Sequence, residues 1–293
     1  MSDPGAIDTA SARAIRYLLA SAKYEIIPLK NAMSAAEALP TDATVTVTAS
    51  PARGLDATIE LSELLAGRGH PVIPHLSARS VRDRGHMEEI VARLDRAGIN
   101  RAFVVAGDND EPGAYFDGLS LLEALDEAGH GLTEIGIPCY PEGHPNISDE
   151  LLLQALRDKS RFAAYMTTQI CFDPDTIRSW VKSMRAEGID LPVHLGLPGV
   201  APVHKLIAIS ARIGIGNSVR FLSKNTNLVG KLVRPGGYAP DVLILSLAST
   251  FVDPDAAIAG LHFYTFNQTK STGKWRVDFE AELDRLIAGS VTR

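Results

Sequence analysis

Short apolar runs rich in β-branched residues recur along the chain and alternate with longer amphipathic segments. In segments such as Ser80–Ile99, apolar residues stand three and four positions apart, which is typical of one face of a helix. We predict eight strands, at Tyr24–Leu29, Thr44–Thr48, Val72–Pro74, Ala102–Val105, Glu134–Pro138, Ala163–Thr168, Pro192–Leu197 and Gly260–Tyr264. Helices are predicted between most of them, at Asp56–Ala66, Val81–Ala97, Tyr115–Ala128, Asp149–Lys159 and Pro174–Ala186, with a longer region at Val203–Ser249.

Eight strands that alternate with helices require parallel crossover connections, and that number favours a closed barrel. We therefore predict an α/β fold with one domain, a single (β/α)8 TIM barrel over residues 1–293, with residues 1–20 as an N-terminal helical extension. A doubly wound open sheet is the alternative fold. After the last strand, Lys270, Lys274 and Arg276 either attract an anionic tail of a ligand or form a solvated charged loop, and we favour the loop.

Composition and charge exclude several classes of protein. The 293 residues are 45% hydrophobic and 22% charged, with a net charge of −6, so no basic footprint for nucleic acid is present. No apolar run is long enough to span a membrane, and residues 1–22 do not resemble a signal peptide. Cys139 and Cys171 have neither metal-site nor disulfide spacing, so we expect structural thiols, no metal and a cytoplasmic location.

Polar residues stand at almost every predicted strand end, where a barrel has its active site. They are Glu25, Thr48, His75, Asp108, Tyr140 with His144, Gln169, Gly199, Thr265 and Asn267. Glu25 differs from the others because it lies inside an apolar strand, where a carboxylate is costly unless it is paired or protonated. It is therefore either a functional acid or half of a structural salt bridge. His75 and His144 are either site residues or loop histidines with local partners.

The stretch "GIPCYPEGHP", residues 136–145, forms a stiff loop after the fifth strand. Its three prolines fix φ and remove backbone donors, so the strand cannot continue. Tyr140, Glu142 and His144 are thus presented on a rigid ledge.

Seven motifs in this order resemble the methylenetetrahydrofolate reductase family. They are "YEIIPL", "IPHLSAR", "VVAGDND", "YPEGHP", "TTQICFD", "GLPGVAPV" and "LHFYTFN". "YPEGHP" is similar to the family's Tyr-Pro-Glu-x-His-Pro loop, and "LHFYTFN" to its closing Phe-Tyr-Thr-Leu-Asn. The resemblance runs from the first strand to the eighth and implies the same barrel fold.

The resemblance implies reduction of 5,10-methylenetetrahydrofolate to 5-methyltetrahydrofolate, a step of one-carbon metabolism and methionine biosynthesis. Ring opening to an N5 iminium needs an acid that stays protonated near neutral pH, and Glu25 matches it. Asp108 matches an aspartate beside the pterin and is expected to act in catalysis and substrate binding. The other implied substrate-binding residues are Gln169, Tyr264 and Asn267. The implied cofactor-binding residues are Thr48, His75, Tyr140, His144, Gln154 and Arg157.

The chain departs from the family pattern where the family holds FAD. Leu151 takes an acidic position, Asp158 replaces a lysine, and Ala106 replaces an arginine. A carboxylate near a diphosphate is unfavourable by the sign of its charge. A folate-side glutamine is also lost, at Ala208. The chain thus resembles a mycobacterial-type branch that works without flavin, so we expect no FAD and direct hydride transfer from NADH. NADPH stays open because no ribose-recognition residue is identified.

Three other functions remain open from the sequence. One is an FAD-dependent reductase with altered contacts, and another is a tetrahydrofolate-dependent methyltransferase or demethylase barrel. The third is a folate-binding subunit without activity, against which the retained Glu25 argues.

Whether the protein forms a homo-oligomer is not indicated. "GIGN", at Gly214–Asn217, lacks the rest of a dinucleotide fingerprint, and the basic residues of Asn217–Tyr238 give only a weak indication of a phosphate site.

Overall fold

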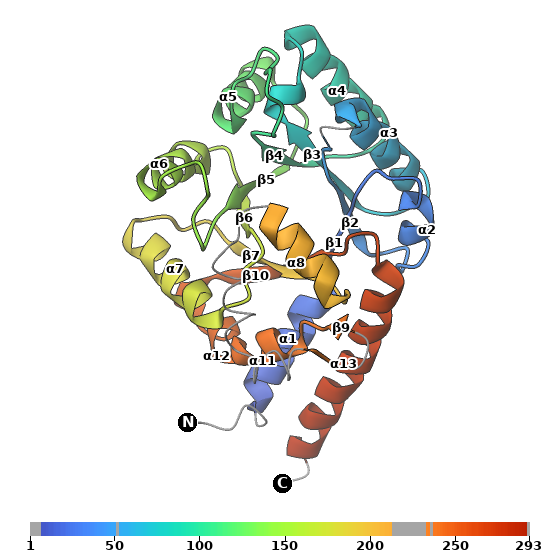
Figure 1. Cartoon of the computed structure of the whole chain (residues 1–293), viewed down its shortest axis with the longest axis vertical. Coiled ribbons are helices and arrows are strands. Elements are labelled where there is room, and N and C mark those ends of the chain that lie inside the picture. Colours follow the sequence, from blue (N-terminus) through green and yellow to red (C-terminus); the bar gives the residue numbers. More distant parts are fainter. Residues whose placement is uncertain (1–6, 51–52, 213–232, 235–236, 292–293) are drawn as a thin grey trace.

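In the computed structural model, eight parallel strands close into a barrel surrounded by helices (Figure 1). The structure describes residues 7–50, 53–212, 233–234 and 237–291. The strand order around the barrel is β1-β10-β7-β6-β5-β4-β3-β2. The strands are β1 (Lys23–Ile26), β2 (Thr44–Val47), β3 (Val72–Ser77), β4 (Arg101–Val105), β5 (Glu134–Cys139), β6 (Tyr165–Thr168), β7 (Val193–Pro198) and β10 (Ile258–Tyr264). The predicted barrel is confirmed, and the closed strand order excludes the open sheet.

The helices of the outer layer follow the strands in turn. They are α2 (Ala32–Ala36), α3 (Gly54–Ala66), α4 (Arg84–Arg96), α5 (Gly118–Ala128), α6 (Asp149–Ser160), α7 (Pro174–Ala186) and α13 (Thr269–Val291), with α1 (Thr9–Ala20) before β1. Short 3-10 turns lie at η1 (Ala78–Ser80) and η2 (Pro254–Ala256). None of the helices in the described ranges is long and apolar enough to cross a membrane.

Capping residues explain why two helices begin later than predicted. Asp83 accepts a hydrogen bond from the His86 amide, so α4 begins at Arg84 rather than at Val81. Asp117 and Ser120 form a reciprocal capping box, so α5 begins at Gly118 rather than at Tyr115. An aspartate side chain that satisfies the first free amides fixes a helix start more firmly than the apolar period does.

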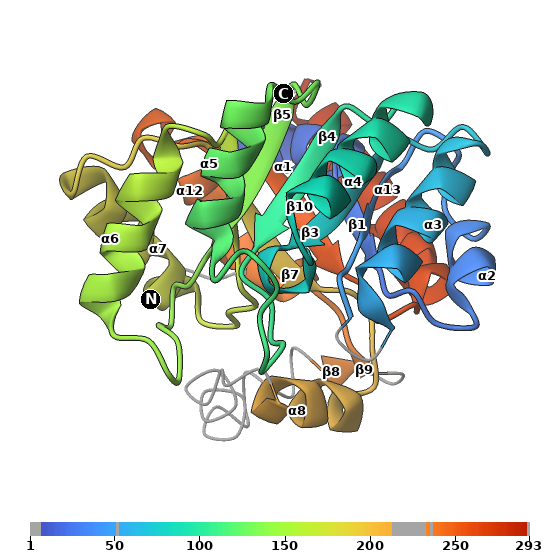
Figure 2. The ribbon, with the colours of Figure 1, turned by 90° about the horizontal axis from the view of Figure 1, so that it is seen from above.

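The predicted helical region at Val203–Ser249 is broken into several elements. It contains α8 (Val203–Arg212), the short antiparallel pair β8 (Val233–Arg234) and β9 (Gly237–Tyr238), α11 (Asp241–Ser246) and the start of α12 (Ala248–Phe251). The motif "GIGN" and most of the basic stretch after it lie outside the described residues. Helix α8 follows β7 in the chain, and Figures 1 and 2 show it over the end of the barrel formed by the C-terminal ends of the strands.

The prediction of a charged loop after the last strand is wrong, because Lys270, Lys274 and Arg276 belong to helix α13. Lys274 pairs with Asp278 and Arg276 with Glu280, each four residues on, which is the spacing of neighbours on a helix face. Arg276 also donates to the Tyr24 hydroxyl. The charges therefore support the helix and join it to β1.

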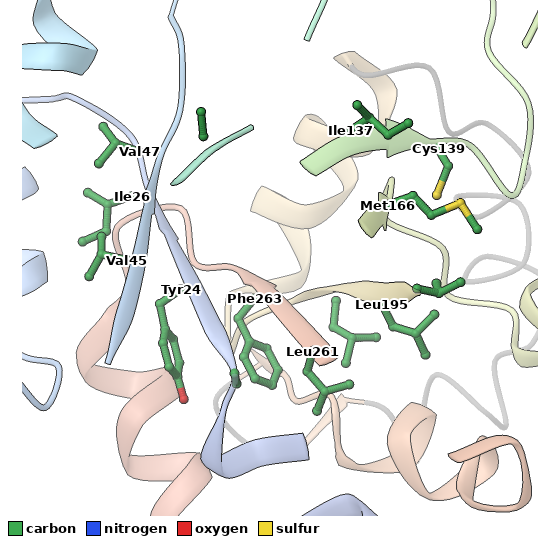
Figure 3. Close-up of a cluster of buried hydrophobic side chains, with 14 of the residues drawn as sticks. Tyr24, Ile26, Val45, Val47, Ile137, Cys139, Met166, Leu195, Leu261 and Phe263 are labelled. Atoms are coloured by element: carbon green, nitrogen blue, oxygen red, sulfur yellow. The ribbon is translucent and has the colours of Figure 1, made fainter. Parts of the chain in front are cut away.

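The main hydrophobic core lies between the barrel and the helices. Successive residues of a strand point to opposite faces, and the apolar ones point outward here. Figure 3 shows members of this outward-facing cluster, with Tyr24, Ile26, Val45, Val47, Ile137, Cys139, Met166, Leu195, Leu261 and Phe263 labelled. The alternate positions of the same strands face the barrel interior.

The interior of the barrel is unusually polar. Lys23 of β1 forms an ion pair with Glu134 of β5, on the opposite side of the strand order, and its ammonium lies 3.5 Å from the ring centre of Tyr165. Contacts between strands that are not neighbours must pass through the interior. A small apolar cluster of Ile73, Phe103 and Tyr165 fills part of this space.

Candidate active site

Glu25 lies near the end of β1 with its side chain inside the barrel. The residue is 8% exposed, and its Oε2 atom lies 3.2 Å from Nε2 of His262 on β10 and 3.9 Å from Nε2 of His75 on β3. Burial raises the pKa of Glu25 to about 7, against a smaller opposing effect of His75. The carboxyl group can therefore hold a proton near neutral pH.

The two histidines beside Glu25 are kept neutral. Burial lowers the pKa of His75 to about 4, with Glu25 opposing, and that of His262 to about 3, with the charge of Lys23 adding to the effect. A neutral imidazole has one N–H donor and one acceptor nitrogen. His262 can thus accept the proton of a carboxylic acid or donate to a carboxylate at the same short distance.

His75 is predicted as a cofactor contact, and the structure places it beside the acid. Its Nε2 atom is buried and makes no hydrogen bond within the described residues. Its ring packs against Phe103 with 4.8 Å between ring centres. The histidine therefore separates Glu25 from the apolar part of the barrel interior.

Asn267 and Thr265 hold the backbone around Glu25. The Asn267 amide accepts from the Ile27 N–H at 2.8 Å and donates to the Ile27 carbonyl at 3.0 Å, while the Thr265 hydroxyl donates to the Glu25 carbonyl. Asn267 has a φ of 58°, a left-handed conformation that asparagine adopts more readily than most residues. The structure thus gives Asn267, a predicted substrate contact, a role in fixing the chain after Glu25.

Tyr264 and Gln169 lie at the exits of two strands, β10 and β6. The Tyr264 hydroxyl donates to the Thr168 carbonyl at 2.9 Å. Gly196 leaves space for the tyrosine ring, since a Cβ at this position would lie 2.6 Å from it. The Gln169 Oε1 accepts from the Ile170 N–H at 2.9 Å. The amide nitrogen of Gln169 has no partner among the described residues and is the group that remains to donate to a ligand.

The loop that carries Asp108 is fixed from two sides. Arg79, in η1, donates to the carbonyls of Asn109 at 2.6 Å and Asp110 at 2.9 Å. Gly107 has a φ of 88°, and a Cβ there would lie 1.9 Å from the Ser77 Oγ. Only glycine fits this position. Asp108 itself is exposed at the exit of β4, where it can meet a ligand.

Tyr140 and His144 form the ledge after β5, and Thr48 lies at the exit of β2. The two rings of the ledge meet edge to face, 5.4 Å apart. Burial raises the pKa of Tyr140 to about 12, and the nearby charges of Cys139 and Asp108 add to this. Thr48 is half-buried, and its carbonyl accepts from the Thr58 hydroxyl at 2.8 Å. Tyr140 is therefore close to Asp108, whereas no contact joins Thr48 to either.

Two of the polar side chains of helix α6 that were expected to bind a cofactor are already bound within the protein. Leu151 is 62% exposed, Gln154 donates to Asp158 at 2.8 Å, and Arg157 pairs with Glu187. Arg157 lies in the last turn of the helix, at the end away from the strand exits. The structure thus does not bring Arg157 to the other predicted cofactor residues. On the face to which the resemblance assigns FAD contacts, Gln154 and Arg157 are thus bound to other side chains, and Leu151 offers no polar group.

The sequence prediction missed His262 and Arg79. His262 stands two residues before Tyr264, and period-two alternation places both on one strand face, so a signal was present in "LHFYTFN". For Arg79 no local signal exists, because its role depends on carbonyls that are 30 and 31 residues further along the chain.

Neither metal-ligating clusters nor disulfides occur in the described part of the chain. No group of three or more His, Cys, Asp or Glu side chains among these residues could hold a metal ion. Cys139 and Cys171 are free and buried, and burial raises the pKa of both thiols. Both are therefore poor nucleophiles.

Solved structures with similar folds are distant. A putative phosphonomutase from Burkholderia cenocepacia J2315 has a TM-score of 0.42 and 16% identity, covering 65% of this chain and 85% of its own. A chitinase from Rhizomucor miehei has a TM-score of 0.45 and 11% identity, covering 88% of this chain and 99% of its own. At these scores the similarities say nothing about activity.

The sequence comparisons are more specific. A yeast protein (Saccharomyces cerevisiae), Methylenetetrahydrofolate reductase 2, is 29% identical over 146 residues, which are 47% of this chain and 23% of the yeast protein. The chain thus matches about a quarter of that relative. The family model for Methylenetetrahydrofolate reductase matches residues 27–224, about two thirds of the chain. The match includes Asp108, Tyr140 and Gln169, and it begins two residues after Glu25 and ends before β10. The chain belongs to the methylenetetrahydrofolate reductase family.

Proposed function

We propose that this chain reduces 5,10-methylenetetrahydrofolate to 5-methyltetrahydrofolate with NADH as the direct hydride donor. Family membership supports the overall reaction. The single observation that carries the chemistry is Glu25, a buried carboxyl group whose pKa is raised to about 7 between two neutral histidines. Such a group supplies an acid at the pH at which the reaction must run.

Glu25 opens the five-membered ring of the substrate. The methylene carbon bridges N5 and N10 and accepts hydride poorly until the bond to N10 breaks. Proton transfer from the Glu25 carboxyl group to N10 makes the amine a leaving group and leaves an iminium at N5. Because the carboxyl group is nearly dry, it does not lose its proton to water beforehand.

Asp108 and Gln169 orient the pterin. The Asp108 carboxylate is exposed on a loop that Arg79 and Gly107 hold in place, so it can accept from the amino-pyrimidine edge and stabilise the cation. The free amide nitrogen of Gln169 can donate to a ring acceptor. Both side chains stand at strand exits, on the same end of the barrel as the ledge.

Hydride then passes from the nicotinamide to the iminium carbon while both ligands are bound. The ledge of Tyr140 and His144 is the nicotinamide wall, since its prolines keep the ring positions fixed and hydride transfer needs van der Waals contact. FAD takes no part in the proposed reaction, because the outer face of α6 presents Leu151, a Gln154 already bonded to Asp158, and an Arg157 paired with Glu187.

Two measurements test the proposal. The absorbance spectrum of the purified protein should lack the flavin bands, and NADH absorbance should fall only when methylenetetrahydrofolate is present. Parallel assays with NADPH decide between the two donors. A yellow protein with bound FAD would replace direct transfer by a flavin cycle. Failure to oxidise either nucleotide with methylenetetrahydrofolate would remove the reductase and favour a transferase.

A further inference from the structure

A line of polar side chains runs from Glu25 through the barrel to its opposite end. Glu25 contacts His262, and His262 is the direct register partner of Lys23 on the neighbouring strand. The charge of Lys23 reaches both His262 and His194, lowering the pKa of each. Lys23 also pairs with Glu134 at 3.4 Å. The line therefore crosses the barrel interior from the acid toward the N-terminal ends of the strands.

The far end of this line opens into a pocket. A pocket of about 330 Å³ at the N-terminal ends of the strands is lined by Lys23, Arg101, Glu134, His194 and Ala259, among others. His194 stacks on Tyr165 with ring centres 4.4 Å apart, and its buried Nδ1 has no hydrogen-bond partner in the described structure. The pocket is polar, large enough for water, and lies away from the substrate end.

The proposed reaction makes this geometry useful. Each turnover consumes one NADH and one proton and releases NAD⁺, so Glu25 must regain a proton from the medium. The strand exits would then hold the folate and the nicotinamide, and α8 lies over the same end of the barrel (Figure 2). While these ligands are bound, a proton can reach Glu25 only from the N-terminal end of the barrel.

We propose that the polar interior of the barrel is a proton route, in which Lys23 and His262 return a proton from the N-terminal pocket to Glu25 after each turnover. This proposal rests on the proposed reductase function. The Glu25 carboxylate takes the proton on Nε2 of His262. His262 takes a proton on Nδ1 from the Lys23 ammonium, directly or through water, and Lys23 regains one from water in the pocket. A half-turn of the imidazole ring then brings the protonated nitrogen back to Glu25 for the next turnover. One proton enters for each proton that Glu25 delivers to N10.

The groups that face Lys23 suit such a transfer. Burial lowers the pKa of Lys23 to about 8, with the charge of Arg101 adding to this and Glu134 opposing it. The ammonium therefore gives up its proton more easily than an ordinary lysine. Burial also lowers the pKa of His194 to about 3, so this histidine adds no second positive charge to the route.

The test separates the first turnover from the later ones. In Lys23→Met, Glu25 still holds its resident proton when substrates arrive, so stopped-flow NADH oxidation should show a first turnover at the wild-type rate. Later turnovers should be at least about tenfold slower, giving a burst of one NADH per site. A purely structural role of Lys23 would slow both phases together, and equal slowing or unchanged rates in both phases would refute the route.

Two further variants keep the test decisive. Ala259→Trp, at the exposed rim of the pocket, should give the same burst while leaving Lys23 in place, and it decides the matter if Lys23→Met does not fold. Thr46→Val is the matched control, since this interior hydroxyl makes no hydrogen bond to any described residue, and it should show no burst. A wild-type protein that does not oxidise NADH would remove the proposed function itself. Turnover in the wild type without a burst in Lys23→Met and Ala259→Trp would remove only the proton route.

Discussion

The carboxyl group of Glu25 faces the imidazole of His262 inside the barrel, with 3.2 Å between Oε2 and Nε2. Both residues are buried, on neighbouring strands that close the barrel. Because burial raises the pKa of Glu25 to about 7 and lowers that of His262 to about 3, the carboxyl group keeps its proton and the pair is uncharged below about pH 7. This pairing keeps a proton on a carboxyl group in a dry environment, as the proposed acid requires.

Replacing the acid should abolish most turnover and leave binding intact. Glu25→Gln is nearly isosteric but cannot donate the proton that opens the ring, and general acid catalysis is typically worth about 10²–10⁴-fold. We expect kcat to fall by that factor, with folate affinity unchanged when measured by fluorescence quenching. A variant that kept more than about a third of the wild-type kcat would show that Glu25 is not the acid.

The same substitution should stabilise the fold at alkaline pH. The folded-state pKa of Glu25 is about 7 and its ordinary value is 4.5, so ionisation costs stability as pH rises through this interval. Glu25→Gln removes that cost, worth up to about 3 kcal/mol above pH 7 from the pKa difference. The Tm of the variant should therefore exceed that of the wild type at pH 8 and match it near pH 4.5. An equal difference at both pH values would contradict a raised pKa.

Asp108→Asn should lower kcat/KM for methylenetetrahydrofolate without lowering stability. Asp108 is exposed at the exit of β4, so its carboxylate contributes little to the fold. Loss of its charge removes an acceptor for the pterin and the electrostatic stabilisation of the iminium, which we expect to cost about 10²-fold or more. Asp110→Asn, two residues further on, is the control. If kcat/KM is unchanged in Asp108→Asn and reduced in Asp110→Asn, the assignment of Asp108 is wrong.

Gly107→Ala should disturb the site and the fold together. The added Cβ would lie 1.9 Å from the Ser77 Oγ, at a φ of 88°. Strain of this kind costs about 1–3 kcal/mol, and the shift of the loop would move Asp108. Gly129→Ala, with a φ of 72° and nothing within 4 Å, has only the conformational cost. Urea unfolding should show the larger loss for Gly107→Ala, and only that variant should lose activity.

The fold was predictable because its signals are local. Every barrel strand was predicted within a few residues, since short β-branched runs bounded by helical periods leave few alternatives. Helix α13 was missed because its mixed charges resemble a loop until pairs such as Arg276 and Glu280 are seen four residues apart on one face. The helix starts at Arg84 and Gly118 depend on single capping side chains, which an apolar period does not detect.

The site was predictable only in part, because contacts between distant strands decide it. Glu25 stood out as a carboxylate in an apolar strand, but its partner His262 is 237 residues away. Asn267 reads as a ligand contact at a strand exit, while its amide is held by the Ile27 backbone. Arg157 lies on the expected helix but at its end away from the strand exits. A linear motif does not show at which end of a helix a residue lies relative to the site.

The cofactor prediction follows from the outer face of α6. Leu151 and Asp158 of α6, and Ala106 after β4, replace three polar groups of the family pattern, and Gln154 and Arg157 are bound to Asp158 and Glu187. Each lost contact is worth on the order of 1 kcal/mol, so flavin should bind at least about a hundredfold more weakly.

The protein should purify colourless, and added FAD should not raise its rate. Initial rates with both substrates varied should give intersecting double-reciprocal lines, because both ligands must be bound together. Stoichiometric FAD, or parallel lines, would show that this face still holds a flavin.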